Sequence, residues 1–286
     1  MARAQLRLGT LVSVRIRGLP PERARPALET AFQAISEIHT LMSFHDAASD
    51  VSRLNGAAAK RAVRVDARTL HVMRRAGDIS RASHGAFDIS VAPLLVERGY
   101  LPRHASLEPP DPAAIFEDIE FLSGRRVRFR RPLWIDLGGI AKGYAVDHAL
   151  ERMDLPAEVE VCINAGGDLR VAGPHCESVL LRVEEPPAAR GPVVHLSEGS
   201  LATSTGRPGV SRHEGADGPH FHGAQRTAVG RHAAASVIAT ECLYADALTK
   251  VVLALGLNSD AILRQFGATA FMHDSEGRWH RLGFEQ

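Results

Sequence analysis

The segment 135–147, "IDLGGIAKGYAVD", combines a flexible backbone, one cation and two carboxylates within a short stretch. Its apolar beginning predicts a strand end, its glycines predict a bend, and we expect a helix to start near Ile140. A helix N-terminus presents unpaired N–H groups and a partial positive charge, and glycines let a ligand come close to the backbone. With the ammonium group of Lys142 added, Gly138 and Gly139 suit a phosphate or pyrophosphate. The alternative is a tight strand-to-helix turn that leaves Lys142 in solvent.

A second glycine pair, Gly166 and Gly167, follows the apolar run 159–163 and precedes Asp168. The first glycine segment is not a P-loop, because that motif needs a serine or threonine after its lysine, and here Gly143 follows Lys142. Two strand ends that each carry a glycine pair and an aspartate can converge on one ligand, which strengthens the phosphate hypothesis. Taken alone, Asp168 is more typical of a turn.

In the segment "GAFDISVAPL", the ring of Phe87 stands next to the carboxylate of Asp88. A ring and a neighbouring carboxylate suit a flat heterocycle, although a phenylalanine by itself is more typical of a hydrophobic core. The residues alone leave both alternatives open, a ligand wall and an ordinary core position.

Composition limits the classes of protein to consider. The chain has 286 residues, 45% of them hydrophobic, which is enough for one domain over 1–286 or for two intimately packed halves. A net charge of +1 creates no general attraction to nucleic acid, so we expect no nucleic-acid partner. The arginine-rich run 124–132 alternates with apolar residues and predicts a strand with one solvated face. The three cysteines, Cys162, Cys176 and Cys242, form no C-x-x-C pair, which argues against a disulfide framework.

The N-terminal residues 1–18 have no long apolar region and no lipobox cysteine, so we expect an opening strand pair rather than a signal peptide. No segment of the sequence approaches the roughly 18 unbroken apolar residues of a membrane helix. We therefore expect a cytoplasmic protein without membrane insertion.

The remaining pattern predicts mixed secondary structure. Apolar residues recur at helical spacing in 25–43, in 66–83 with Asp66 as N-cap, and in 240–256, which Gly256 closes. This order is not a regular alternation of strands and helices, so we expect an α+β fold with a mostly antiparallel sheet and packed helices. The other predicted elements are a helix at 140–152, a long loop over 205–235, a short helix with closing strands near the C-terminus, and strands at 125–130, 132–136, 159–163, 178–184 and 192–197.

Seven segments, taken together and in this order, resemble a known family. They are "LGTLVSVRI", "LMSFHDAASDVSRLN", "GAFDISVAPL", "IDLGGIAKGYAVD", "NAGGDL", "LATS" and "VIATECLYADALTK". This order is similar to that of the ApbE flavin transferases, also called FAD:protein FMN transferases, and the resemblance spans about residues 5–285. The segments 85–94 and 135–147 are the most specific.

The resemblance implies an ApbE-like fold and an activity. Members of the family bind FAD and a divalent cation, usually Mg²⁺. They cleave the FAD pyrophosphate, attach FMN to a threonine or serine of an acceptor protein, and release AMP. Some members mainly hydrolyse FAD to FMN and AMP.

The resemblance also implies roles for individual residues. His220 stands at the position of a family histidine, and Asp246 matches the metal-ligating aspartate, so both are expected at the catalytic centre. Ala141 would offer its carbonyl oxygen to the metal beside Asp246. The residues that the resemblance places near FAD are Met42, Ala86, Phe87, Asp88, Asp136 and Lys142. The argument from the two glycine segments adds Gly138, Gly139, Gly166, Gly167 and Asp168 to the expected FAD contacts.

Two segments depart from the family pattern. The position four residues after the metal aspartate, usually threonine or aspartate, is Lys250, which would lie one helical turn beyond Asp246 on the same face. Thr249 would point about 100° away. In the 220–227 segment, Gly223 and Ala224 stand where the family usually has Asp-Pro. The FAD side of the site is thus retained, whereas the metal and acceptor side is altered.

These departures leave several hypotheses. In the first, the transferase works with a modified metal site, in which Mg²⁺ binds weakly or is replaced by Lys250. In the second, the chain binds flavin with weak or no transfer, or hydrolyses FAD. A third is a flavin-binding or scaffold protein that kept only the fold. A fourth is a transition-metal site at His220 and His222, because alternate strand residues share a face.

Overall fold

The computed structural model describes residues 1–104, 107–183, 191–206, 218–229 and 233–284. Its helices are α1 (Pro21–Met42), α2 (Asp50–Ala57), α3 (Ala67–Ala82), α4 (Ala92–Glu97), α5 (Ala141–Met153), α6 (Cys242–Leu255) and α7 (Asp260–Gln265). Short 3₁₀ turns are η1 (Ile89–Val91), η2 (Phe116–Asp118) and η3 (Gly256–Ser259). The fold is α+β, as the sequence predicts.

The main sheet has eight strands in the order β1-β2-β6-β7-β10-β13-β14-β15, and every neighbouring pair is antiparallel. This confirms the mostly antiparallel sheet and the opening strand pair. Smaller sheets are β3-β5-β4, β8-β9 and β11-β12. The strands are β1 (Ala2–Arg7), β2 (Thr10–Arg17), β3 (Val63–Arg64), β4 (Ile119–Leu122), β5 (Arg126–Phe129), β6 (Glu160–Ala165), β7 (Asp168–Ala172), β8 (Glu177–Leu180), β9 (Val193–Leu196), β10 (Gly199–Thr205), β11 (Phe221–His222), β12 (Thr227–Ala228), β13 (Ala234–Ala239), β14 (Thr269–His273) and β15 (Trp279–Leu282).

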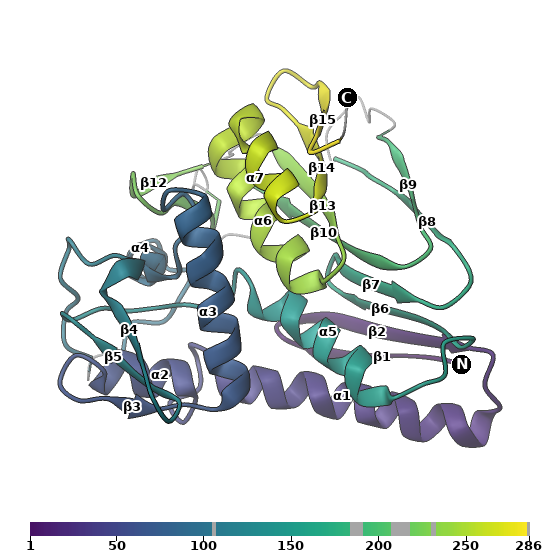
Figure 1. Ribbon diagram of the computed structural model, residues 1–286, viewed down its shortest axis with the longest axis horizontal. Coiled ribbons are helices and arrows are strands. Elements are labelled where there is room, and N and C mark those ends of the chain that lie inside the picture. Colours follow the sequence, from purple (N-terminus) through teal and green to yellow (C-terminus); the bar gives the residue numbers. More distant parts are fainter. Residues whose placement is uncertain (105–106, 184–190, 207–217, 230–232, 285–286) are drawn as a thin grey trace.

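Two layers cover the main sheet. Helix α5 packs against both α1 and α6, and α5 and α6 lie against strands β6, β7, β10 and β13 (Figure 1). A smaller apolar cluster on the other face, which includes Leu169, Leu201 and Val194, joins the sheet to the β8-β9 hairpin. Beside the helical layer lies a second group of elements, formed by α2, α3, α4 and β3-β5-β4. The larger apolar core is continuous through both groups.

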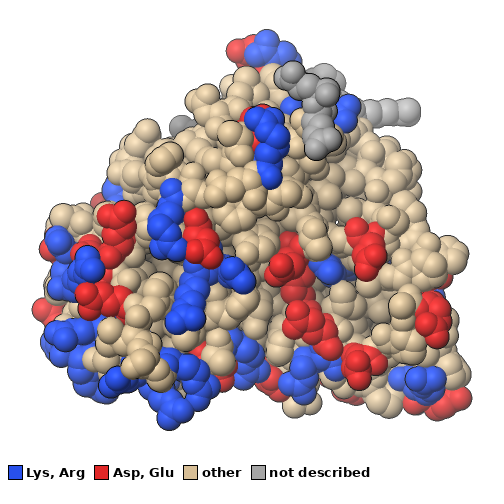
Figure 2. All heavy atoms as spheres, in the orientation of Figure 1, with Lys and Arg blue, Asp and Glu red and all other residues tan. Residues whose placement is uncertain are grey.

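Most local predictions are confirmed. Asp66 caps α3 by accepting the N–H of Arg68, and Gly256 ends α6 with a φ of 57°. Strand β5 exposes Arg126 and Arg128 and buries Val127 and Phe129, as its alternation predicts. All three cysteines are free. On the face in Figure 2, Lys and Arg side chains gather at the lower left with some acidic side chains among them, and more acidic side chains lie at the centre and right.

The predicted strand at 132–136 is wrong, because these residues have no regular secondary structure. A side-chain amide takes the place of a neighbouring strand. Asn55 Oδ1 accepts the N–H of Ile135 at 2.8 Å, and Asn55 Nδ2 donates to the Ile135 carbonyl at 3.0 Å. The N–H of Asp136 then donates to the Ile89 carbonyl at 2.8 Å. This stretch is therefore an extended support for the glycine turn that follows it.

The predicted loop over 205–235 lies partly outside the described residues, which leave out 207–217 and 230–232. Its described middle part, 218–229, contains the β11-β12 hairpin. Arg226 holds this hairpin by donating to the Ser90 carbonyl at 3.1 Å and to Ser90 Oγ at 3.1 Å. This part is thus ordered by specific contacts rather than irregular.

Candidate functional site

Two cavities meet at the turn of the "IDLGG" segment. The larger, of about 510 Å³, has Phe87, Gly139, His220 and Lys250 among its wall residues. The smaller, of about 240 Å³, is lined by Met42 and other residues of α1 and the segment after it. Their walls share four residues, Leu101, Asp136, Gly138 and Lys142. The turn and Lys142 therefore lie at the boundary between the two adjoining cavities.

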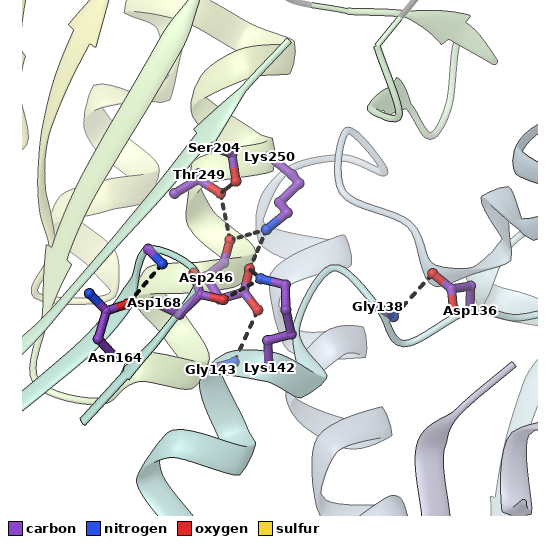
Figure 3. A network of polar contacts seen from close by, with 11 residues as sticks. Asp136, Gly138, Lys142, Gly143, Asn164, Asp168, Ser204, Asp246, Thr249 and Lys250 are labelled. Atoms are coloured by element: carbon purple, nitrogen blue, oxygen red, sulfur yellow. Dashed lines mark hydrogen bonds and ion pairs between the residues drawn. The ribbon is translucent and has the colours of Figure 1, made fainter. Parts of the chain in front are cut away.

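The turn itself offers backbone rather than side chains. The carboxylate of Asp136 accepts the N–H of Gly138 at 3.0 Å (Figure 3). A Cβ on Gly138 would lie 2.9 Å from Asp136 Oδ2, and one on Gly139 would lie 3.7 Å from both Phe87 and Lys250. Burial raises the pKa of Asp136 to about 6, against the opposing effect of the Gly138 N–H.

Helices α5 and α6 cap each other, which fixes the geometry of the site. Asp147 of α5 accepts the N–H groups of Cys242 and Leu243, at 2.9 and 2.8 Å, at the start of α6. In return, Asp246 of α6 accepts the N–H of Gly143 at 3.1 Å, in the first turn of α5. Any Cβ on Gly143 would lie 2.2 Å from the Cys242 carbonyl oxygen, so only glycine allows this crossing. The second carboxylate of the motif is thus structural, and the α5 N-terminus is capped by protein.

Four charged side chains meet beyond these caps (Figure 3). Lys142 donates to Asp168 Oδ2, and its Nζ lies 3.7 Å from Asp246 Oδ1. Lys250 donates to Asp246 Oδ1 and, at 2.9 Å, to the Asp246 main-chain carbonyl. The prediction that Lys250 lies one turn beyond Asp246 on the same face is therefore confirmed. Two carboxylates and two ammonium groups form one cluster, which we call the charge cluster.

The pKa values in the charge cluster follow from burial and pairing. Burial and the neighbouring charge of Asp246 raise the pKa of Asp168 to about 6. Burial also acts to raise the pKa of Asp246, but the ammonium groups of Lys142 and Lys250 outweigh it and hold that pKa below its usual value. For Lys142, burial acts to lower the pKa, and the two aspartates more than reverse this. Lys142 therefore carries its charge at neutral pH. Asp246 is the common partner of the two lysines.

Thr249 points away from the charge cluster, as its helical position predicts. Its hydroxyl donates to the Asp246 carbonyl at 2.7 Å and lies 2.8 Å from Ser204 Oγ. Because the Thr249 proton is used on the carbonyl, Ser204 must donate to Thr249. This pair fastens β10 to α6. In the sequence, "LATS" stood out only as one of the segments that resemble the family, and it indicated no such role for Ser204.

The β11-β12 hairpin closes the larger cavity. Gly223 donates to the Ala86 carbonyl at 2.9 Å, and Ala224 donates to the Gly85 carbonyl at 2.8 Å. A Cβ on Gly223 would lie 2.4 Å from Asp88 Cβ, so a larger residue could not stand there. The altered segment is therefore packed closely against "GAFD". Proline at 224 could not donate the second of these hydrogen bonds.

His220 reaches the cavity wall from the start of this hairpin. Burial, together with the charge of Lys250, lowers the pKa of His220 to about 3. Its imidazole is therefore neutral at physiological pH, and the same burial and positive charge make it a weak base. His222, the other histidine of the proposed transition-metal pair, accepts the N–H of Gln225 through Nδ1 at 3.3 Å instead. The described residues include no group of three His, Cys, Asp or Glu side chains placed to hold a metal ion.

Asp88 is partly used by its own loop. Its Oδ1 accepts the N–H of Ser90 at 2.7 Å, which caps η1, and its Oδ2 accepts the N–H of Phe116 at 3.4 Å. The buried ring of Phe87 nevertheless lies in the wall of the larger cavity, and Met42 in the wall of the smaller one. Ala86 is buried and contributes its carbonyl to the hairpin contact. Ala141 begins α5 and lines the smaller cavity.

Gly166 and Gly167 form the two-residue turn between β6 and β7. Both have positive φ, 65° and 106°, as such a hairpin turn requires. Neither is among the described residues that line the two cavities. The hairpin brings Asp168, the first residue of β7, to Lys142. Among the predicted residues, the structure thus gathers Asp136, Gly138, Gly139, Lys142, Asp168, His220 and Asp246 around one place, with Phe87 and Met42 in the adjoining walls.

The family model described as "ApbE family" matches residues 8–272 of this chain. The chain belongs to the ApbE family. Among curated relatives, the FAD:protein FMN transferase of Vibrio cholerae is 24% identical over 87% of this chain and 79% of the relative. The FAD:protein FMN transferase of Salmonella typhimurium is 24% identical over 94% of this chain and 83% of the relative.

Solved ApbE structures share the fold. The ApbE protein of Thermotoga maritima superposes with a TM-score of 0.82 at 23% identity, covering 99% of this chain and 96% of that one. The flavin transferase ApbE of Vibrio cholerae gives a TM-score of 0.78 at 18% identity, covering 98% and 96%. The expected ApbE-like fold is therefore confirmed. Of the helices in the described ranges, none has the length and apolarity that crossing a bilayer requires.

Proposed function

We propose that this chain is an FAD:protein FMN transferase, which cleaves FAD and attaches FMN to a threonine or serine of an acceptor protein, with release of AMP. The observation that carries the proposal is the pair of adjoining cavities joined at Asp136, Gly138 and Lys142, within an ApbE fold. FAD has the matching form, because two ring systems flank a central pyrophosphate. One cavity contains an aromatic wall at Phe87 and the other an apolar wall at Met42.

In this proposal the pyrophosphate lies at the boundary of the two cavities. There Gly138 and Gly139 carry no side chain that would hold a ligand away from the backbone. Lys142 is fixed by Asp168 but retains a side-chain exposure of 33%, so its ammonium group remains accessible to a ligand. An ammonium that a buried carboxylate holds in place loses little freedom when it binds an anionic oxygen.

The transfer step requires one new bond, one broken bond and a proton acceptor. The acceptor hydroxyl oxygen bonds to the phosphorus of the FMN half while the bond from that phosphorus to the bridging oxygen breaks. The bonding electron pair leaves with AMP, and the hydroxyl proton goes to a base. His220, in the wall of the larger cavity, is the candidate for that role on its position. Burial and the charge of Lys250 make it a weak base in the free protein, and a bound anionic pyrophosphate would offset the charge of Lys250. Asp246 acts by holding Lys142 and Lys250 in position.

The family resemblance implies a Mg²⁺ at Asp246 and Ala141, but the residues present do not fit that ion. Asp246 Oδ1 is paired with Lys250, and Oδ2 accepts the N–H of Gly143. A divalent ion bound to this carboxylate would stand beside an ammonium group, which repels it and has no lone pair to offer. We therefore derive no catalytic step through a metal.

The proposal is tested by incubating the purified protein with FAD and serine- and threonine-containing peptides. AMP, free FMN and covalently bound flavin are measured by chromatography. We expect AMP and covalent flavin in equal amounts, and His220→Gln should slow their formation about 100-fold. His175→Gln, at an exposed histidine, is the matched control and should behave as wild type.

Other results would separate the alternatives. AMP with free FMN and no covalent flavin would indicate an FAD hydrolase. FAD binding without AMP would indicate a flavin-binding protein. Absence of FAD binding would refute the proposed function.

A further inference from the structure

The sequence contains only three lysines, and two of them belong to the charge cluster. The third, Lys60, is an exposed residue paired with Glu108 on the surface. Lys250 is the more buried of the two cluster lysines, with a side-chain exposure of 13%. Burying an ammonium is costly unless its charge is matched and its N–H groups are bonded. The placement of Lys250 therefore needs an explanation beyond solubility or a helix surface.

The hydrogen-bond inventory of the two ammonium groups leaves donors for a ligand. Each ammonium has three N–H donors. Lys250 uses two of them on Asp246, one on Oδ1 and one on the main-chain carbonyl. Lys142 uses one on Asp168, and its 3.7 Å approach to Asp246 is too long for a hydrogen bond. Both side chains line the larger cavity, so their remaining donors are available to an anion in it.

Lys250 lies close to the glycine turn. A Cβ on Gly139 would lie 3.7 Å from Lys250 Cε and 3.7 Å from the Phe87 ring. The stem of Lys250 therefore passes close to Gly139 in the bare turn, and its charged end reaches Asp246. An ammonium is a compact point charge, whereas a guanidinium is planar and larger. A compact charge held by a buried carboxylate resembles a bound cation in size and position.

We propose that Lys250 takes the place of a divalent cation, so that this chain binds FAD and acts on its pyrophosphate without Mg²⁺. In this arrangement Asp246 holds an ammonium instead of a metal, and Lys142 and Lys250 together offer N–H donors and positive charge to the phosphate oxygens. No metal takes part in the step. The inference rests on the proposed function and concerns the source of positive charge at the same site.

The test measures FAD affinity by flavin fluorescence and AMP release by chromatography, each in EDTA and over a Mg²⁺ titration. The wild type should give the same affinity and rate in EDTA and in saturating Mg²⁺, within about twofold. Lys250→Thr removes the ammonium and leaves a hydroxyl one turn from Asp246. In EDTA it should bind FAD at least tenfold more weakly, and added Mg²⁺ should restore most of the loss. Lys60→Thr is the matched control and should behave as wild type.

A second readout does not depend on FAD. Binding of Mn²⁺ is followed by electron paramagnetic resonance for the wild type, Lys250→Thr and Lys250→Gln. The wild type should show no saturable Mn²⁺ site, and Lys250→Thr should show one. Lys250→Gln keeps the length of the side chain without its charge, and should lose FAD affinity in EDTA as Lys250→Thr does. Circular dichroism establishes that each variant is folded.

The possible failures are distinguishable. Wild-type FAD binding or AMP release that is lost in EDTA and recovered with saturable Mg²⁺ dependence would overturn the inference but leave the proposed function intact. A saturable Mn²⁺ site in the wild type, absent from Asp246→Asn, would also overturn it. No binding of FAD by the wild type with or without Mg²⁺ would instead refute the proposed function.

Discussion

The turns at 137–139 and 166–167 look alike in the sequence but do different things in the structure. Each has a glycine pair next to an aspartate at the end of an apolar run. In the first turn the glycines line a cavity, and their φ angles are not positive. In the second turn both φ angles are positive and the glycines close a hairpin. One turn therefore offers its backbone to a ligand, and the other uses its backbone to deliver Asp168.

The difference shows two separate uses of glycine. At Gly166 the backbone conformation itself requires glycine, and a Cβ would lie 2.4 Å from Thr10 Oγ1. At Gly138 the conformation is open to other residues, and the nearest atom to a Cβ is the end of the Asp136 side chain. Substitution should therefore damage stability in the second turn and ligand binding in the first.

The largest expected effect is on stability at the hairpin turn. Gly166→Ala should lower the free energy of unfolding by about 2–4 kcal/mol, because it combines an unfavourable positive φ with a clash against Thr10. Thermal denaturation should show a decrease in Tm of roughly 5–10 °C. FAD affinity of the folded variant should stay within about twofold of wild type.

Gly138→Ala is the matched substitution in the first turn. It should change the free energy of unfolding by less than about 1 kcal/mol, because the Asp136 side chain can move aside. Its FAD affinity should fall severalfold, since a methyl group would project where the two cavities meet. Equal losses of stability in Gly138→Ala and Gly166→Ala would contradict the assignment of ligand binding to the first turn and of stability to the second.

The next largest effect is expected at Lys142. This residue lines the cavities beside the first turn and is bonded to Asp168, which follows the second turn. Lys142→Met should weaken FAD binding by about 1–3 kcal/mol, the contribution of a hydrogen bond to a charged group. Isothermal titration calorimetry measures this directly, with Lys60→Met as the exposed control. An unchanged affinity in Lys142→Met would exclude a direct contact between this ammonium and the ligand.

The smallest effect concerns the aspartate of the first turn. Burial raises the pKa of Asp136 from 3.8 to about 6, so its carboxyl is neutral below that pH and anionic above it. An anion beside the pyrophosphate repels it, so FAD affinity should fall about threefold to tenfold between pH 5 and pH 7. Asp136→Asn should show a smaller change over this range than the wild type, and the change that remains is assigned to Asp168, whose pKa is also about 6.

The Asp136 carboxyl should also make the stability of the FAD-free protein depend on pH. Because its pKa is higher in the folded protein than the ordinary value of 3.8, it stabilises the fold fully below about pH 4. This stabilisation is lost as the pH rises through about 6. Denaturant unfolding of the wild type should show this loss relative to Asp136→Asn. Identical pH profiles would mean that the Asp136 carboxyl is solvated in the free protein.

Much of the fold could be predicted from local signals. Alternation in residues 126–129, the Asp66 cap and the final Gly256 are each determined within a few residues of chain, and the structure confirms them. The strand at 132–136 could not be excluded this way. The backbone groups of Ile135 are hydrogen-bonded to the side chain of Asn55, which is 80 residues distant in sequence. No local sequence pattern predicts such a partner.

The site was predictable in part. The spacing of Asp246 and Lys250 places them on one helical face, and their pairing follows from helix geometry alone. The capping of α5 by Asp246 and of α6 by Asp147 joins residues 95 to 103 positions apart. Such contacts depend on how two helices cross, which the periodicity of each helix does not specify.

The sequence by itself determined the kind of groups available: two glycine turns, two unusual lysines and the carboxylates that accompany them, in the order of the ApbE family. The tertiary structure alone decided which of these groups share a place. It brought Asp168 to Lys142 through a hairpin, directed Asp147 into a helix cap, and packed Gly223 against Asp88. The reason is physical: helix and strand periods fix the direction of a side chain locally, whereas the charge that it meets depends on the packing of distant elements.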